Sequence, residues 1–224
     1  PKVLHRLAGR PLLDHVLDLA IELVPAERIV VVVGHGAEQV AAVATARGAR
    51  TVLQEPQLGT GDAVRVALSG AGSDTGGVVV LSGDVPLLRA VSVDALRRAV
   101  EGGAAAALLT AVLDEPGAYG RVLRDPDGGV AAIVEARDAT PAELAVREVI
   151  AGVYAFARGP LEEALASLRP DNDQGEYYLT DVIGTLRARG LPVAAHVLAD
   201  PIEMAGVNTV DDLRRLEETL ARQG

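Results

Sequence analysis

The sequence contains no cysteine among its 224 residues. Disulfides, thiolate nucleophiles and cysteine-ligated zinc sites are therefore excluded. The four histidines are scattered along the chain and show no metal-ligand spacing. Any metal that the protein binds is therefore expected to be a hard cation held by oxygen atoms.

Long apolar runs are also missing, since none approaches the roughly 18 residues that a membrane-spanning helix needs. The amino-terminal residues show no secretory pattern. The formal net charge is −10, whereas nucleic acids and anionic membranes both need a basic surface to displace their counterions. We therefore expect a soluble, cytoplasmic protein with neither a nucleic acid nor a membrane as its partner.

Lysine is nearly absent. Of the 21 lysine and arginine residues, 20 are arginine, and Lys2 is the only lysine. Lys2, His5, Arg6 and Arg10 lie within ten residues, and no acidic residue precedes Asp14. One end of the molecule could therefore receive a polyanion. A compact, rotatable ammonium group is typical of phosphate sites, although a single lysine can also be there by chance.

The stretch at residues 78–88 organises the rest of the chain. Residues 78–81 (Val-Val-Val-Leu) predict a strand buried on both faces, as in the middle of a parallel sheet. Asp84 follows its carboxyl end, the edge where open α/β sheets bind ligands, and Gly83 and a rigid Val-Pro step restrain it. This position suits a metal ligand. The alternative is an aspartate that caps the next turn.

Strands and helices alternate through the first half of the chain, and one domain over residues 1–224 is expected. Strands are predicted at 28–34, 50–54 and 104–113, and helices at 11–24, 36–48, about 62–68 and 91–100. Further on, a hairpin is predicted at 119–135, strands at 149–157 and 192–198, and helices at 160–168, 181–189 and after a capping box at Thr209 and Asp212. The fold class is therefore α/β, with a Rossmann-like, mostly parallel sheet, helices on both faces and an antiparallel hairpin.

Two polar segments are further candidates for ligand binding. Gly59, Thr60 and Gly61 precede a predicted helix, where backbone N–H groups can face a ligand, although an ordinary tight turn has the same pattern. Gln54 ends the preceding strand, and its amide offers both a donor and an acceptor to the edge of a base. Asn208 precedes the last capping box, so it could serve the helix start or bind an ion.

Seven groups of residues occur in the order found in one known family. They are Val3-Leu4-His5 with Ala8-Gly9-Arg10-Pro11, Gln54 with Leu58-Gly59-Thr60-Gly61, Gly83-Asp84-Val85-Pro86-Leu87, Tyr119-Gly120-Arg121, Ile133-Val134-Glu135 with Asp138-Ala139-Thr140, Gln174-Gly175-Glu176-Tyr177-Tyr178, and Gly206-Val207-Asn208. Over nearly its whole length, the chain resembles the uridylyltransferase domain of the bifunctional bacterial N-acetylglucosamine-1-phosphate uridylyltransferases, the GlmU family. The fold implied is of the nucleotide-diphospho-sugar transferase type.

The resemblance implies a reaction of UTP with N-acetylglucosamine 1-phosphate that gives UDP-N-acetylglucosamine and pyrophosphate, with Mg²⁺ as cofactor. A sugar phosphate is already an anionic nucleophile, so positioning and charge neutralisation suffice. On this template, Asp84 and Asn208 would hold the Mg²⁺, and Lys2 would neutralise phosphate charge in the in-line attack.

The resemblance also implies the substrate contacts. Gln54, Gly59 and Thr60 would hold the uracil, and Ser82 would lie near the nucleotide. Gly120 and Glu135 would bind the sugar.

The sequence departs from the family pattern at the sugar site. Ile150 stands where the family has an asparagine that touches the sugar, in the pattern Glu-x-Asn-x-Gly, and Ala118 replaces a glycine. Losing a hydrogen bond to a buried polar group costs roughly 1–3 kcal/mol, so sugar selectivity is open to change. Thr209-Val210 replaces the family's Asn-Arg.

Two parts of the family pattern are not in this sequence. Members carry a strand and a glycine-rich loop of the type Leu-Ala-Ala-Gly-x-Gly-Thr-Arg-Met shortly before the Pro-Lys pair, whereas this sequence starts at Pro1-Lys2. A central strand is therefore expected to be missing from the sheet. The hexapeptide-repeat β-helix that acetylates glucosamine 1-phosphate is also absent, so no acetyltransferase activity is expected from these residues.

Two alternatives to uridylyl transfer follow. One is a related sugar-1-phosphate nucleotidylyltransferase with a different sugar or base, which Ile150 leaves open. The other is a non-catalytic nucleotide-sugar-binding domain, but Asp84, Asn208 and Lys2 argue against it, since a binder needs no metal-phosphate apparatus. The sequence leaves a homo-oligomer open.

Overall fold

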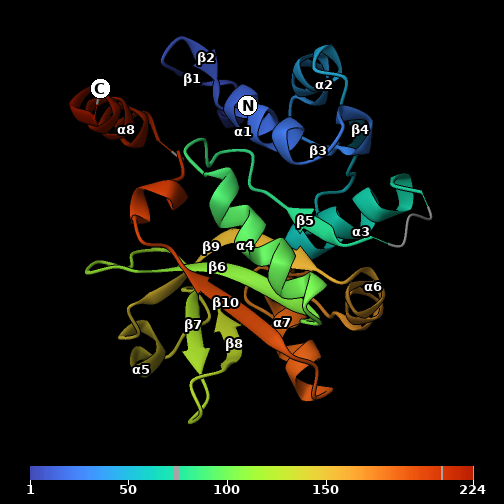
Figure 1. The fold of residues 1–224 in the computed structure, drawn as a ribbon, viewed down its shortest axis with the longest axis vertical. Helices are drawn as coiled ribbons and strands as arrows, with labels where there is room; N and C mark the ends of the chain where they lie inside the picture. Colours follow the sequence, from blue (N-terminus) through green and yellow to red (C-terminus); the bar gives the residue numbers. More distant parts are fainter. Residues whose placement is uncertain (73–75, 208, 224) are drawn as a thin grey trace.

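The computed structural model describes residues 1–72, 76–207 and 209–223 (Figure 1). The strands are β1 (Arg6–Leu7), β2 (Arg10–Pro11), β3 (Val30–Val33), β4 (Arg50–Leu53), β5 (Val78–Val80), β6 (Ala106–Val112), β7 (Arg121–Arg124), β8 (Val130–Val134), β9 (Glu148–Phe156) and β10 (Val193–Val197). The helices are α1 (Leu12–Leu23), α2 (Ala37–Ala46), α3 (Thr60–Gly70), α4 (Ala90–Glu101), α5 (Pro141–Leu144), α6 (Arg158–Ser167), α7 (Asp181–Ala188) and α8 (Val210–Gln223). Short 3₁₀ turns cover Lys2–Leu4, Ala26–Arg28 and Pro201–Met204.

A six-stranded sheet forms the centre of the molecule. Its order is β10-β6-β9-β7-β8, and β5 also pairs with β9. Strands β5, β6, β7 and β10 run in one direction, whereas β8 and β9 run in the other. The prediction of a mostly parallel α/β sheet with an antiparallel hairpin is therefore confirmed. The antiparallel position of β9, between β5 and β6, was not predicted.

The two faces of this sheet carry separate apolar cores. Side chains of β9 alternate between them: Tyr154 and Phe156 face one core, and Val153 and Ala155 face the other. Helices α6 and α7 pack on the first core, and α4 packs on the second. This alternation is the normal period of a strand covered on both faces, so the helices hold β9 rigidly in the middle of the sheet.

Strands β3 and β4 form a parallel pair that is separate from the six-stranded sheet. Figure 1 shows them beside α1 and α2, apart from the main sheet. A cavity of about 1430 Å³ lies between the two parts and is lined by residues of both β3 and β5. The prediction that β5 is buried on both faces is confirmed in part. Val78 and Val80 pack against one core and Val79 against the other, but each side chain is only half-buried, because the cavity runs beside them.

Local signals account for the remaining elements. The predicted capping box of the last helix is confirmed, because Thr209 and Asp212 exchange backbone-to-side-chain hydrogen bonds of 2.9 and 3.1 Å. A second capping box, between Thr140 and Glu143, starts the short helix α5, which was not predicted.

In the described segments, no helix is both long and apolar enough to cross a bilayer.

Candidate active site

The candidate site lies where two strands follow one another along the same edge of β9. Val80 of β5 pairs with Tyr154, and Arg121 of β7 pairs with Val149. The stretch of β9 between these pairs carries Gly152, at φ +72°. The end of β5 and the residues just before β7 therefore flank an interruption in the sheet, where Val80 and Gly120 line the large cavity.

Asp84 is carried into this cavity by the loop after β5. Its Oδ2 lies 2.5 Å from Lys2 Nζ, and the exposed fractions of the two side chains are 18% and 49%. The Asp84 carbonyl accepts a 3.0 Å hydrogen bond from the N–H of Val207. Asn208, the second expected metal ligand, lies outside the described residues. The chain immediately before Asn208 is thus bonded to Asp84.

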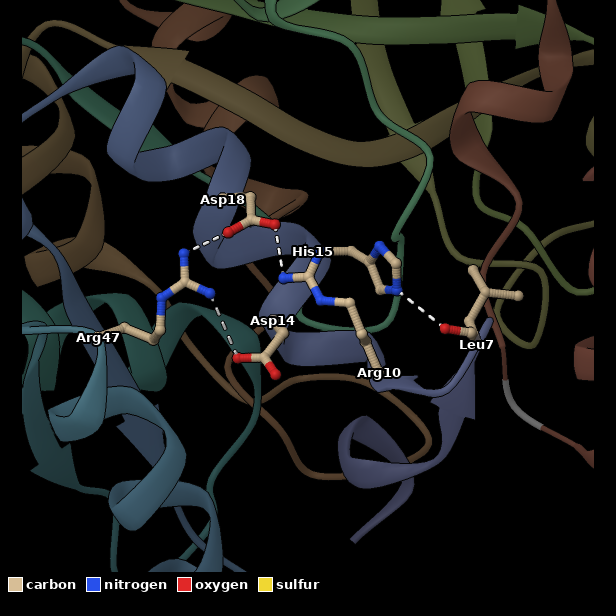
Figure 2. Close-up of polar contacts among 6 residues, drawn as sticks. All are labelled: Leu7, Arg10, Asp14, His15, Asp18 and Arg47. Carbon is tan, nitrogen blue, oxygen red and sulfur yellow. Dashed lines mark hydrogen bonds and ion pairs between the residues drawn. The ribbon is translucent and has the colours of Figure 1, made fainter.

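The amino-terminal segment that carries Lys2 is anchored to α1. Figure 2 shows this network, in which Arg10 and Arg47 both bind Asp18, Arg47 also pairs with Asp14, and His15 bonds the Leu7 carbonyl. The hydrogen bond from Arg47 is the main cause that lowers the pKa of Asp18.

The basic cluster near the amino terminus is therefore divided between two tasks. Arg10 is held by Asp18 at 2.6 Å, and Arg6 donates to the Gly9 carbonyl within its own turn. Lys2 instead lines the cavity. Of these three residues, Lys2 is therefore the one placed to bind an anion in the cavity.

The expected sugar-binding residues come together on the other side of the cavity. An added Cβ on Gly120 would lie 3.1 Å from Ile150 Cγ2 and 3.4 Å from Glu135 Oε2. The Ile150 N–H donates to the Gly120 carbonyl at 3.0 Å. Any side chain larger than hydrogen at position 120 would therefore press on both neighbours. Ile150 is 5% exposed and packs in the apolar core while it borders the cavity.

Glu135 is a half-buried carboxyl group at this site. The Thr180 hydroxyl donates to its Oε1 at 2.9 Å. Burial raises the pKa of Glu135, and the charge of Asp138 adds to this effect. The pKa of Asp181 is also raised, first by burial and then by Glu135. Glu135 therefore loses its proton less readily in this site than a glutamate in water does.

Ser82 lies at the interruption between β5 and β7. Its hydroxyl donates to the Gly152 carbonyl at 3.1 Å, and a Cβ on Gly152 would lie 2.9 Å from the Ser82 oxygen. Ser82 lines the cavity, as expected of a residue near a nucleotide, but it also keeps β5 against β9.

The turn at Gly59 and Thr60 docks against the segment before α7. Gly59 has φ +103°, and a Cβ there would lie 2.8 Å from the Tyr177 carbonyl oxygen. Thr60 Oγ1 accepts from the Leu179 N–H at 3.0 Å, and the Gly61 N–H donates to the Tyr177 carbonyl at 2.7 Å. These glycines are thus required for close packing, and Thr60 also borders the cavity.

Gln54 does not offer its whole amide to a ligand, as the sequence suggested. Its Nε2 donates to the Gly59 carbonyl at 3.0 Å and to Asp62 Oδ2 at 2.8 Å. Both amide protons are used inside the protein. This leaves Oε1 as the atom that can meet a base.

Three residues in or beside the cavity were given no functional role from the sequence: Asp62, Tyr119 and Thr180. Tyr119 lines the cavity and hydrogen-bonds the backbone of Gly206; its pKa is raised, chiefly by burial. Asp62 could have been noticed as an acidic residue in the first helical turn after Gly-Thr-Gly. The role of Thr180 depends on a contact 45 residues away along the chain, so no local pattern reveals it.

The model of one protein family, described as the MobA-like NTP transferase domain, matches residues 1–190. The chain belongs to this NTP transferase family. Its enzyme class is therefore nucleotidyltransferase. Proteins named "Bifunctional protein GlmU" are similar to it: the one from Paracidovorax citrulli is 52% identical over 97% of the chain, and the one from Pelotomaculum thermopropionicum is 45% identical over 100%. The chain spans about half the length of these curated relatives, 46% and 49% respectively.

Solved structures agree with the NTP transferase fold. A CMP:2-keto-3-deoxy-manno-octonic acid synthetase complexed with CTP superposes with a TM-score of 0.70 at 20% identity, covering 100% of this chain and 92% of that one. A nucleoside-diphosphate-sugar pyrophosphorylase from Vibrio cholerae RC9 gives 0.71 at 17% identity, covering 97% and 91%. At these identities the likeness concerns the fold alone.

Proposed function

We propose that this domain transfers the uridylyl group of UTP to N-acetylglucosamine 1-phosphate, giving UDP-N-acetylglucosamine and pyrophosphate. One observation carries the proposal: Lys2, Asp84, Gly120 and Glu135, which come from four separate segments, line one cavity. The similarity to the GlmU proteins supports the choice of substrates.

The transfer needs no general base. A phosphate oxygen of the sugar phosphate forms a bond to the α-phosphorus of UTP, and the bond from that phosphorus to the bridging oxygen breaks, so pyrophosphate leaves. The protein must hold both substrates in line and offset the phosphate charge. The Lys2 ammonium would turn from Asp84 to a phosphate oxygen, because the lysine side chain is half-exposed and its contact with Asp84 is easily exchanged.

Magnesium is the cofactor proposed for this site, and Asp84 with Asn208 would hold it. Asp84 presents one hard carboxylate to the cavity. Among the described residues, no three acidic or histidine side chains gather into a metal site. This donor set fits a Mg²⁺ ion that takes its other oxygens from phosphate and water. When bound, the ion supplies charge neutralisation at the phosphates.

The sugar would lie over Gly120, whose lack of a side chain keeps space beside Glu135 and Ile150. Glu135 would accept a hydrogen bond from a sugar hydroxyl, since Thr180 holds its other oxygen. Ile150 offers no such bond, so a related sugar 1-phosphate is the second candidate substrate.

Pyrophosphate release by the intact gene product tests the proposal. The assay would combine Mg²⁺ with UTP, CTP, ATP, GTP and dTTP, each paired with N-acetylglucosamine, glucose and galactosamine 1-phosphates. UTP with N-acetylglucosamine 1-phosphate should give the highest kcat/KM. A faster reaction with another pair would replace the proposed substrates. No release with any pair would favour a binding domain.

A further inference from the structure

Asp62 accepts a hydrogen bond from Gln54, the residue that would contact the base. Gln54 ends β4, where its backbone N–H donates to the Val33 carbonyl at 2.8 Å, and the whole residue is 9% exposed. Asp62 lies in the first turn of α3 and is 4% exposed. The 2.8 Å bond from Gln54 Nε2 to Asp62 Oδ2 therefore joins two buried side chains.

The polarity of the Gln54 amide follows from its partners. The Gly59 carbonyl and the Asp62 carboxylate are both acceptors, so the NH₂ group must face them and the carbonyl oxygen must face away. Turning the amide over would place Oε1 against two other oxygens. Arg65 pairs with Asp62 and lies 5.2 Å over the Tyr177 ring, so its guanidinium group holds the carboxylate in place.

The Oε1 atom of Gln54 is left for a ligand. Within the described segments, no hydrogen bond to this oxygen occurs, and no fully buried side-chain oxygen or nitrogen lacks a partner. The oxygen is therefore not fully buried, and it lies at the carboxyl end of β4. The site presents a single acceptor with a fixed direction.

We propose that Asp62 determines base specificity by fixing Gln54 so that only an acceptor faces the base. This rests on the proposed function, in which Gln54 meets uracil. Uracil joined to ribose has one N–H donor, at N3, whereas cytosine has a lone pair at that position. In the same pose, cytosine would place its lone pair against Gln54 Oε1. A buried acceptor that meets another acceptor rejects the wrong base strongly.

The test compares UTP with CTP in the wild type and in two variants. Asp62→Ala removes one of the two bonds that orient the amide. The ratio of kcat/KM for UTP to that for CTP should fall by roughly tenfold or more, because one unpaired polar contact is worth about that factor. Asp62→Asn keeps an acceptor oxygen at the same place and is the matched control, so it should retain most of the ratio. An equal loss for both nucleotides in Asp62→Ala would overturn the inference and leave a structural role.

A second measurement needs no variant. The wild type should use 3-methyl-UTP at least about tenfold less efficiently than UTP, because a methyl group replaces the N3–H. Equal use of the two would overturn the inference even if Asp62→Ala does not fold. Absence of any uridylyl transfer by the wild type would overturn the proposed function as well. An Asp62→Ala variant that prefers UTP by the same factor as the wild type would overturn this inference alone.

Discussion

Lys2 Nζ lies 2.5 Å from Asp84 Oδ2 at the mouth of the cavity. Each of these charges neutralises the other while the cavity holds no phosphate. In the proposed reaction they act on different partners, since the ammonium meets phosphate and the carboxylate meets Mg²⁺. The ion pair therefore holds both groups in position. Phosphate and Mg²⁺ must break this pair when they bind.

Replacing Asp84 by Asn tests the metal role of the carboxylate. Turnover with Mg²⁺ should fall by roughly 100-fold or more, because a metal site supplies several kcal/mol of charge stabilisation. The free energy of unfolding should change by less than about 1 kcal/mol, since an ion pair with a half-exposed lysine contributes little. Pyrophosphate release and urea unfolding measure these effects. Asp114→Asn, which removes an exposed ion pair with Arg147, is the control. Full activity in Asp84→Asn would refute the metal role.

Replacing Lys2 by Met removes the ammonium and keeps the length of the side chain. The value of kcat should fall by about 10- to 100-fold, because a positive charge at the phosphates is lost. Mg²⁺ should bind more tightly to the substrate-free protein, because it no longer competes with Lys2 for Asp84. Calorimetric titration with Mg²⁺ measures the second effect. Arg6→Met changes a neighbouring exposed charge and should alter neither quantity. A normal kcat in Lys2→Met would exclude the lysine from the reaction.

Replacing Ile150 by Asn tests the sugar pocket. The KM for N-acetylglucosamine 1-phosphate should fall, because an amide beside Gly120 can bond the sugar. Stability should fall by about 1–3 kcal/mol, because the amide enters an apolar core. Ile150→Val is the matched control; it should leave the KM unchanged and cost about 1 kcal/mol. An unchanged or raised KM in Ile150→Asn would mean that this residue does not meet the sugar.

Replacing Glu135 by Gln tests the raised pKa of this carboxyl group. A raised pKa in the folded state means that the group favours folding below its unfolded pKa, about 4.3, and that this stability is lost as pH rises through the folded pKa. The Gln variant should therefore be more stable than the wild type near pH 7, with no difference near pH 4. Gln retains the oxygen that accepts from Thr180. Urea unfolding of both proteins across this range measures the difference, and a gain that is independent of pH would contradict the assignment.

Much of the fold follows from local patterns. Helical periodicity places α1, α4 and α7, and the Asp-Pro-Asp-Gly-Gly turn places the β7–β8 hairpin. The position of β9 could not be read in this way. An apolar strand of alternating faces has the same pattern whether it runs parallel or antiparallel to its neighbours, and only long-range pairing decides its direction. The half-burial of Val79 likewise depends on what lies beside β5.

The site was predictable where chemistry and position coincide. Asp84 is a carboxylate after an apolar strand, and its place in the cavity agrees with that pattern. The orientation of Gln54 was not predictable, because it depends on Asp62, one helical turn into the next element. The packing of Gly59 against Tyr177 joins segments over 100 residues apart, which no local motif contains.

The cavity between β3 and β5 affects how well the backbone of these two strands is protected from water. In the described chain β3 pairs only with β4, and β5 only with β9, so one row of N–H groups on each strand has no strand beside it. In a protein of these 224 residues, those amides should exchange their hydrogens for deuterium much faster than the amides of β6, which is bonded on both sides. Within the sheets, the strands that border the cavity should therefore be the least protected.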